Sequence, residues 1–337
     1  MKNPRSSIYL GIDLDSGNSV YWDLNEAFAP HALVIGPSGS GKTLTLSILA
    51  YRMLKSFNTT IVVFDIKDEY KDRLSKDLNI DVMDIDPFKN PLPICICNEY
   101  NPVKMNRFSH TISKIYGLSE GSRKILLDLL ESSCRYCTPL ERIVNSIEIQ
   151  EKNLILALND IIQTFAIYDT IPSIFHRANR ASATIINLKR VFLQSKELSS
   201  TIIIYILTNI LYNVEPRRTH IPSKAIILDE IWHTIPYISS DLISMLSRYA
   251  RSFGISLLMA SQSIDDLQPY IDTIVGNCSL FIALASHSYS YWHKVSRYLN
   301  LSSKLIEKAL ELKEKGEGVA RIVPKRKPYF IYIDPIE

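Results

Sequence analysis

Near its N-terminus the chain reads Gly36-Pro37-Ser38-Gly39-Ser40-Gly41-Lys42-Thr43, which matches the pattern of a phosphate-binding loop. The loop follows an apolar run at 32–35 and leads into a helical run at 44–55. Glycines allow successive backbone N–H groups to face one anion, and the helix N-terminus adds partial positive charge. An incidental lysine in a glycine-rich turn would not need this strand–loop–helix context. The sequence therefore predicts a nucleoside triphosphate site that runs from Gly36 to Leu44.

Two residues of this loop carry the predicted chemistry. Lys42 would reach the β- and γ-phosphates, and the Thr43 hydroxyl would hold Mg²⁺. ATP and Mg²⁺ are therefore the expected cofactors.

A second motif, Ala225-Ile226-Ile227-Leu228-Asp229-Glu230, is an apolar run that ends in two carboxylates. Such a run is typical of a buried parallel strand, whose C-terminal end is where ligands bind. We expect Asp229 to contact the Mg²⁺ shell and Glu230 to orient and polarise the attacking water.

The bulk composition sets wide limits. The 337 residues exceed a minimal nucleotide-binding core, and a hydrophobic content of 46% suffices for a globular interior. A net charge of +3 does not itself indicate nucleic acid, so any DNA-binding surface must be a local patch. The N-terminus does not resemble a signal peptide, and the apolar segment 201–214 is shorter than the roughly 18 residues that span a bilayer. We expect a cytoplasmic protein that can dock at the inner face of the cell membrane.

Five cysteines occur as Cys95-Ile96-Cys97, Cys134-Arg135-Tyr136-Cys137 and the single Cys278. A CxC and a CxxC pair together could bind zinc, but neither is framed by the glycine-rich knuckles of zinc ribbons. We expect packing or an occasional disulfide, and no metal cluster.

The order of the predicted elements indicates an α/β fold: a RecA-like P-loop ATPase with a mostly parallel sheet and an inserted all-helical subdomain. Residues 1–99 would form the first part of the core, 100–200 the helical insertion and 201–337 the second part of the core. Predicted strands lie at 9–13, 19–23, 60–65, 81–85, 225–229, 256–261, 279–284, 318–323 and 329–333.

Further motifs resemble one family. They are Asp65-Ile66-Lys67-Asp68-Glu69-Tyr70 after the second core strand, Asp229-Glu230-Ile231-Trp232, Arg248 to Gly254, and Leu258-Met259-Ala260-Ser261-Gln262. Together they resemble the motor domain of conjugation and type IV secretion ATPases of the VirB/TraC class, within the HerA/FtsK superfamily of DNA-pumping motors. Ile231 departs from the small residue typical of that position. The resemblance covers residues 30–335, so we expect the motor half of such a protein.

The resemblance implies a homo-hexamer that acts on DNA and docks to a membrane channel or secretion complex. Gln262 would hydrogen-bond the γ-phosphate and the lytic water from the tip of its strand. Arg251, or else Arg248, would serve as an arginine finger for a neighbouring subunit. Asp65 and Glu69 would either position the nucleotide or an adjacent subunit, or have a structural role. The cluster from Tyr289 to Lys294 would either stack nucleic-acid bases or pack inward.

Three functions remain open from the sequence. The first is an ATP-hydrolysing motor of a conjugation-like, secretion-related or DNA-import system. The second is a HerA-like translocase or helicase that works on free DNA in end processing or genome packaging. The third is a nucleotide-gated assembly factor that moves no polymer, although a pure binder would not need Lys42, Asp229, Glu230 and Gln262 together.

Overall fold

In the computed structural model, strand β3 (Ala32–Ile35) lies between two parallel neighbours, β10 (Ile255–Ser261) and β11 (Leu280–Leu284). All four residues of β3 are buried, as are all residues of β10 and β11. Their apolar side chains cannot face water on either side, which is typical of the central strands of a parallel sheet.

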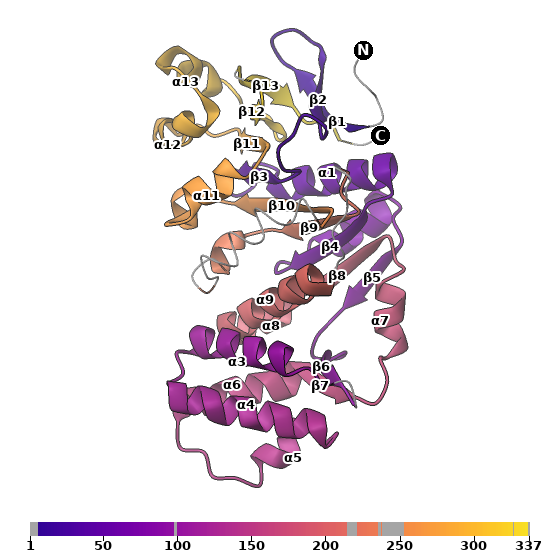
Figure 1. The fold of residues 1–337 in the computed structure, drawn as a ribbon. Helices are drawn as coiled ribbons and strands as arrows, with labels where there is room; N and C mark the ends of the chain where they lie inside the picture. The colour runs from indigo at the N-terminus through magenta and orange to yellow at the C-terminus, as the bar shows by residue number, and fades with distance from the viewer. Residues whose placement is uncertain are drawn as a thin grey trace. The chain divides into compact units, whose positions relative to one another are not determined.

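The structure describes residues 6–97, 100–213, 221–234, 237, 253–325 and 327–335 (Figure 1). The chain divides into two compact units: the first holds Met1–Phe64, Glu69–Val82 and Asn213–Glu337, and the second holds Asp65–Asp68 and Met83–Tyr212. Within the described residues, no helix has both the length and the apolar character needed to cross a bilayer.

The sheet of the first unit runs in the order β2-β1-β13-β12-β11-β3-β10-β9-β4. The strands from β11 to β4 are parallel to one another, whereas β12, β13, β1 and β2 extend the sheet in antiparallel fashion. The remaining strands of this set are β1 (Ser7–Asp13), β2 (Ser19–Asp23), β4 (Thr60–Asp65), β9 (Lys224–Leu228), β12 (Glu317–Ile322) and β13 (Tyr329–Tyr332). The predicted strands and the parallel core are confirmed.

Helix α1 (Lys42–Phe57) follows the predicted phosphate-binding loop and buries an apolar face that includes Leu46, Leu49 and Met53. Among the described residues, the other helices of this unit are α2 (Tyr70–Asp72), α11 (Ile271–Gly276), α12 (Tyr289–Leu299) and α13 (Ser303–Ala309), with single turns at Arg73–Asp77, Ile231–His233 and Asp265–Leu267. Arg52 of α1 joins the chain ends: its guanidinium donates to the backbone oxygens of Tyr9 and Leu10 and pairs with Asp334.

The second unit is largely helical. Its helices are α3 (Pro102–Tyr116), α4 (Glu120–Arg135), α5 (Leu140–Val144), α6 (Lys152–Thr164), α7 (Ser173–Ala178), α8 (Lys189–Gln194) and α9 (Lys196–Asn213). Helices α3, α4 and α6 pack on one another (Figure 1). Asn101 and Ser119 cap the first two, each accepting a backbone N–H bond three residues on.

The prediction of an all-helical segment at 100–200 is wrong for two stretches. β7 (Phe165–Tyr168) pairs in parallel with β6 (Leu92–Ile96), and β8 (Ala183–Asn187) is a largely buried strand. α6 ends at Thr164, and Phe165 already belongs to β7. Apolar runs of four or five residues fit either period, so the pattern alone does not separate them. The strand predicted at 81–85 is present as β5 (Val82–Ile85).

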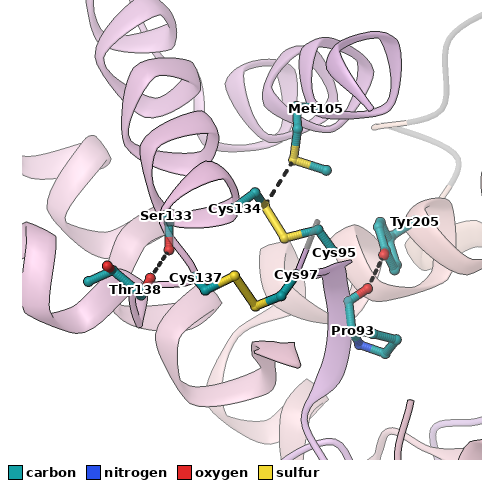
Figure 2. Close-up of a disulfide and its surroundings, with 9 residues drawn as sticks. All are labelled: Pro93, Cys95, Cys97, Met105, Ser133, Cys134, Cys137, Thr138 and Tyr205. Carbon is teal, nitrogen blue, oxygen red and sulfur yellow. Dashed lines mark hydrogen bonds between the residues drawn. A yellow bond between two sulfur atoms is a disulfide. The ribbon is translucent and has the colours of Figure 1, made fainter. Parts of the chain in front are cut away.

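The two cysteine motifs pair with each other. Disulfides join Cys95 to Cys134 and Cys97 to Cys137, so β6 is fastened twice to the C-terminal end of α4 (Figure 2). Cys278 is a buried free thiol. Cys137 has a φ of 49°, the left-handed conformation that often ends a helix and that glycine usually supplies. The Thr138 N–H donates to the Ser133 oxygen there, which closes the helix end.

Candidate nucleotide-binding site

The loop from Gly36 to Thr43 connects the buried end of β3 to the first turn of α1. Gly41 adopts a φ of 106°, a backbone conformation that only glycine reaches without strain. Lys42 is buried, and its ammonium donates to the oxygens of Gly36 at 2.8 Å and Pro37 at 3.1 Å. The side chain therefore folds over the loop to which it belongs, with its charge held at the loop's first two residues.

Asp229 follows β9 directly and meets the loop from the opposite side of β10. The Thr43 hydroxyl donates to Asp229 Oδ2 at 2.9 Å, and the Tyr70 hydroxyl donates to the same oxygen at 3.0 Å. β3 and β9 both pair in parallel with β10, so their carboxyl ends meet at one edge of the sheet. The Thr43 hydroxyl and the Asp229 carboxylate are hard oxygen ligands of the kind that Mg²⁺ prefers.

Glu230 is held in an unusual conformation next to Asp229. Its φ of 55° and ψ of 45° are left-handed, and its backbone N–H donates to Asp229 Oδ1 at 3.0 Å. A residue other than glycine in this region costs on the order of 1–3 kcal/mol, and such residues concentrate at functional sites.

Both carboxylate oxygens of Glu230 accept hydrogen bonds from neutral groups. The Gln262 amide donates to Oε1 at 3.1 Å, and the Trp232 indole N–H donates to Oε2 at 2.9 Å. Gln262 follows the end of β10, where the sequence predicted a polar group beside the acidic strand end. Glu230 is 2% exposed, so its orientation is set by these donors and not by solvent.

Tyr70 and Trp232 are contacts that the sequence analysis did not assign to the site. Tyr70 ends the acidic stretch that follows the second core strand, and Trp232 lies two residues after Glu230. The sequence feature that could have indicated these contacts is an aromatic residue with a polar group next to a carboxylate motif. A buried tyrosine or tryptophan needs a hydrogen-bond partner, and a carboxylate can provide it. Which carboxylate each one reaches depends on packing between distant segments.

Asp65, at the end of β4, holds a turn. Its side chain accepts the backbone N–H groups of Lys67 at 3.2 Å and Asp68 at 2.7 Å. Asp68 in turn accepts from the Asn187 amide and pairs with Lys189. Of the two roles left open for Asp65, these contacts support the structural one.

The aromatic cluster on α12 faces inward at two of its positions. Trp292 is fully buried, and its indole N–H donates to the Ser286 oxygen at 2.8 Å. The Tyr291 hydroxyl lies 3.0 Å from the Ile35 oxygen and 3.1 Å from the Leu284 oxygen, and burial raises its pKa. Base stacking is thus wrong for these two residues. Tyr291 instead fastens α12 to the end of β3, directly before the phosphate-binding loop.

Arg248 and Arg251 lie outside the described residues, so the arginine finger stays a prediction.

The parallel sheet, the loop between β3 and α1 and the acidic end of β9 define a RecA-like P-loop ATPase fold. Within that class, the chain belongs to the family described as "Helicase HerA, central domain", which matches residues 8–221.

A curated relative is the DNA import protein CedB of Sulfolobus acidocaldarius, which is 25% identical over 344 residues. The similarity covers 97% of this chain and 56% of the relative, so the chain spans little more than half of that protein's length.

Two solved structures share the fold. VirB4 of Thermoanaerobacter pseudethanolicus superposes with a TM-score of 0.69 and 17% identity, covering 99% of this chain and 98% of that one. The plasmid coupling protein TrwB, in complex with a non-hydrolysable GTP analogue, gives a TM-score of 0.66 and 14% identity, covering 100% and 91%. At these identities the likeness concerns the fold alone.

Proposed function

We propose that this chain is the ATP-hydrolysing motor of a DNA transfer system, most closely a DNA-import motor. The single observation that carries the proposal is the contact network in which Thr43 meets Asp229 and Gln262 meets Glu230. A protein that only bound nucleotide would need the loop, but not a buried carboxylate oriented by an amide from the next strand. The similarity to a DNA import protein over 97% of the chain supports the choice of substrate.

The loop residues hold the triphosphate in this mechanism. Backbone N–H groups of the loop from Ser38 to Leu44 would surround the phosphates, and the Lys42 ammonium would turn from the loop oxygens to the β- and γ-phosphates. Thr43 and Asp229 would hold Mg²⁺, which when bound neutralises charge on the phosphate oxygens. Tyr70 orients Asp229 through its hydrogen bond.

Glu230 acts on the attacking water. Its carboxylate orients and polarises the water, so that the new phosphorus–oxygen bond forms as the bond to the ADP oxygen breaks. Gln262, which already contacts Glu230, links that carboxylate to the strand end and would respond to the γ-phosphate. Loss of the γ-phosphate would therefore change the hydrogen bonding of Gln262 at the end of β10. This change would couple hydrolysis to movement.

Assembly into a homo-hexamer is part of the proposal. Arg251, or Arg248, from one subunit would complete the site of its neighbour by stabilising charge on the transferring phosphoryl group. The ring would act on DNA and dock peripherally at a channel or secretion complex at the inner face of the membrane.

The test is ATPase activity measured with and without DNA, alongside the oligomer mass of the same sample. We expect DNA to stimulate turnover severalfold at concentrations where hexamers form, and Glu230→Gln to lower turnover by about 10²–10⁴-fold under both conditions. Absence of hydrolysis in the wild-type chain would leave the assembly-factor function. Processive movement on free duplex without any membrane component would favour the HerA-like translocase over an import motor.

A further inference from the structure

The loop that precedes β12 lies against the phosphate-binding loop. The Gly316 N–H approaches the Ser40 oxygen at 3.4 Å, and the Gly316 oxygen accepts the Ile333 N–H at 3.0 Å. Gly316 has a φ of 94°, and a β-carbon at this position would lie 3.0 Å from the Ile333 oxygen. Any residue other than glycine would be strained there, so the C-terminal hairpin formed by β12 and β13 lies close to the nucleotide-binding loop.

Lys315 is directed along that loop by the same geometry. A β-carbon built on Gly41 would lie 3.2 Å from the Lys315 γ-carbon and 3.8 Å from its ε-carbon. Because both carbons approach one point, the aliphatic stem runs beside the loop and does not extend straight into solvent. One bond of about 1.5 Å separates the ε-carbon from the ammonium, so the charge lies next to the residue that precedes Lys42.

The conformation around Lys315 is fixed by its neighbours. The Glu317 carboxylate accepts the backbone N–H groups of Lys313 at 2.8 Å and Glu314 at 2.9 Å, which closes the turn. Glu317 therefore points back at its own turn. Among the residues that the structure describes, the Lys315 ammonium makes no hydrogen bond or ion pair. The cation is exposed and beside a loop built to bind phosphate.

We propose that Lys315 is a second phosphate-directed cation of the nucleotide site, supplied in cis by the C-terminal hairpin; this inference rests on the proposed nucleotide-binding function. The Lys315 ammonium would bind the polyphosphate chain of the bound nucleoside triphosphate. This role is consistent with the close approach of Gly316 to Ser40. Lys42 comes from within the loop and Lys315 from outside it, so the two ammonium groups approach the phosphates from different segments.

The experiment measures the Kd of a fluorescent ATP analogue, without DNA and at low salt, for the wild-type chain and for three variants. Lys315→Ala should weaken binding about tenfold. Lys313→Ala removes the same charge two residues away and should change the Kd less than twofold. Lys315→Arg should restore most of the affinity, and AMP binding should be equal in all four proteins because AMP lacks the polyphosphate chain.

Three outcomes would overturn the inference. Equal losses of affinity in Lys315→Ala and Lys313→Ala would mean that only the overall positive charge of this segment affects binding, and not a contact made by Lys315. An equal loss for AMP would mean that Lys315 merely supports the loop. Weaker binding of a DNA oligonucleotide with unchanged ATP affinity would assign the cation to the DNA backbone. Failure of the wild-type chain to bind ATP would instead refute the proposed function itself.

Discussion

Thr43 and Asp229 are 186 residues apart in the chain, yet the Thr43 hydroxyl donates a 2.9 Å hydrogen bond to Asp229 Oδ2. The contact arises because the strands before these two residues, β3 and β9, both lie parallel to β10. Their carboxyl ends consequently share one edge of the sheet, where open α/β folds bind ligands.

Lys42→Ala should lower ATP affinity by at least about 100-fold, because the phosphates lose their main countercharge in a partly desolvated site. Calorimetric titration of ATP would measure the change. Lys55→Ala is the control, since it removes an exposed lysine from the other end of α1. Wild-type affinity in the Lys42 variant would exclude the loop as the nucleotide site.

Glu230→Gln should bind ATP normally and hydrolyse it about 10²–10⁴ times more slowly. The amide retains the shape of the side chain and can still accept the Trp232 hydrogen bond, so the fold should persist. Gln262→Ala should lower kcat less and weaken ATP binding only slightly, because it removes one donor from Glu230 and one neutral γ-phosphate contact but leaves the Lys42 countercharge in place. Loss of ATP binding in Glu230→Gln would show that Glu230 has a structural role.

Tyr70→Phe should raise the Mg²⁺ concentration for half-maximal ATPase activity about fivefold. The hydroxyl donates to a carboxylate, and such bonds contribute about 1.5–3 kcal/mol, part of which water can replace. Tyr21→Phe, an exposed tyrosine on β2, serves as the control. A lower kcat with an unchanged Mg²⁺ requirement would place Tyr70 outside the proposed metal site.

The two disulfides should stabilise the second unit non-additively. The first bridge closes a loop of about 40 residues and stabilises the fold by about 4 kcal/mol, because it lowers the entropy of the unfolded chain. Once it is formed, the second bridge closes a loop of only a few residues and adds about 2 kcal/mol. Replacing either pair by serine should therefore cost about 2 kcal/mol, and replacing both about 6 kcal/mol. Urea unfolding followed by circular dichroism would measure these values.

The free thiol of Cys278 provides a control for unfolding. Burial raises the pKa of Cys278 to about 12, so this thiol should react with a thiol reagent only after unfolding. ATP affinity should be unaffected by the serine variants, since the cysteines of the disulfides and the phosphate-binding loop belong to different units. A double replacement that costs only the sum of the two single losses would contradict the shared-loop argument.

Arg251→Ala should reduce turnover sharply while ATP affinity stays nearly unchanged, because an arginine supplied in trans does not contact its own subunit's phosphates. Mixing this variant with Lys42→Ala subunits should restore some activity, since each provides what the other lacks. Specific activity of the wild-type chain should also rise with protein concentration while rings form. If mixed rings form but remain inactive, Arg248 is the next candidate.

The local motifs could be predicted because their information is contiguous. The loop at 36–43 carries its glycines, lysine and threonine within eight residues, and β3 and α1 begin and end close to where the apolar patterns change. The errors lie where short apolar runs are ambiguous: β7 and β8 have the length of a strand but are flanked by helices, and their burial comes from neighbours that are distant in the chain.

By itself, the sequence determined the fold class, the phosphate-binding loop, the Asp229–Glu230 pair and the polar strand tip at Gln262. Only the tertiary structure decided which groups meet: that Tyr70 reaches Asp229, that Trp232 and Gln262 hold Glu230, that Cys95 pairs with Cys134, and that Lys315 lies along the loop at Gly41. The physical reason is range. Glycine flexibility and apolar periodicity act over a few residues, whereas side-chain contacts at a sheet edge follow from strand order and packing between segments far apart in the chain.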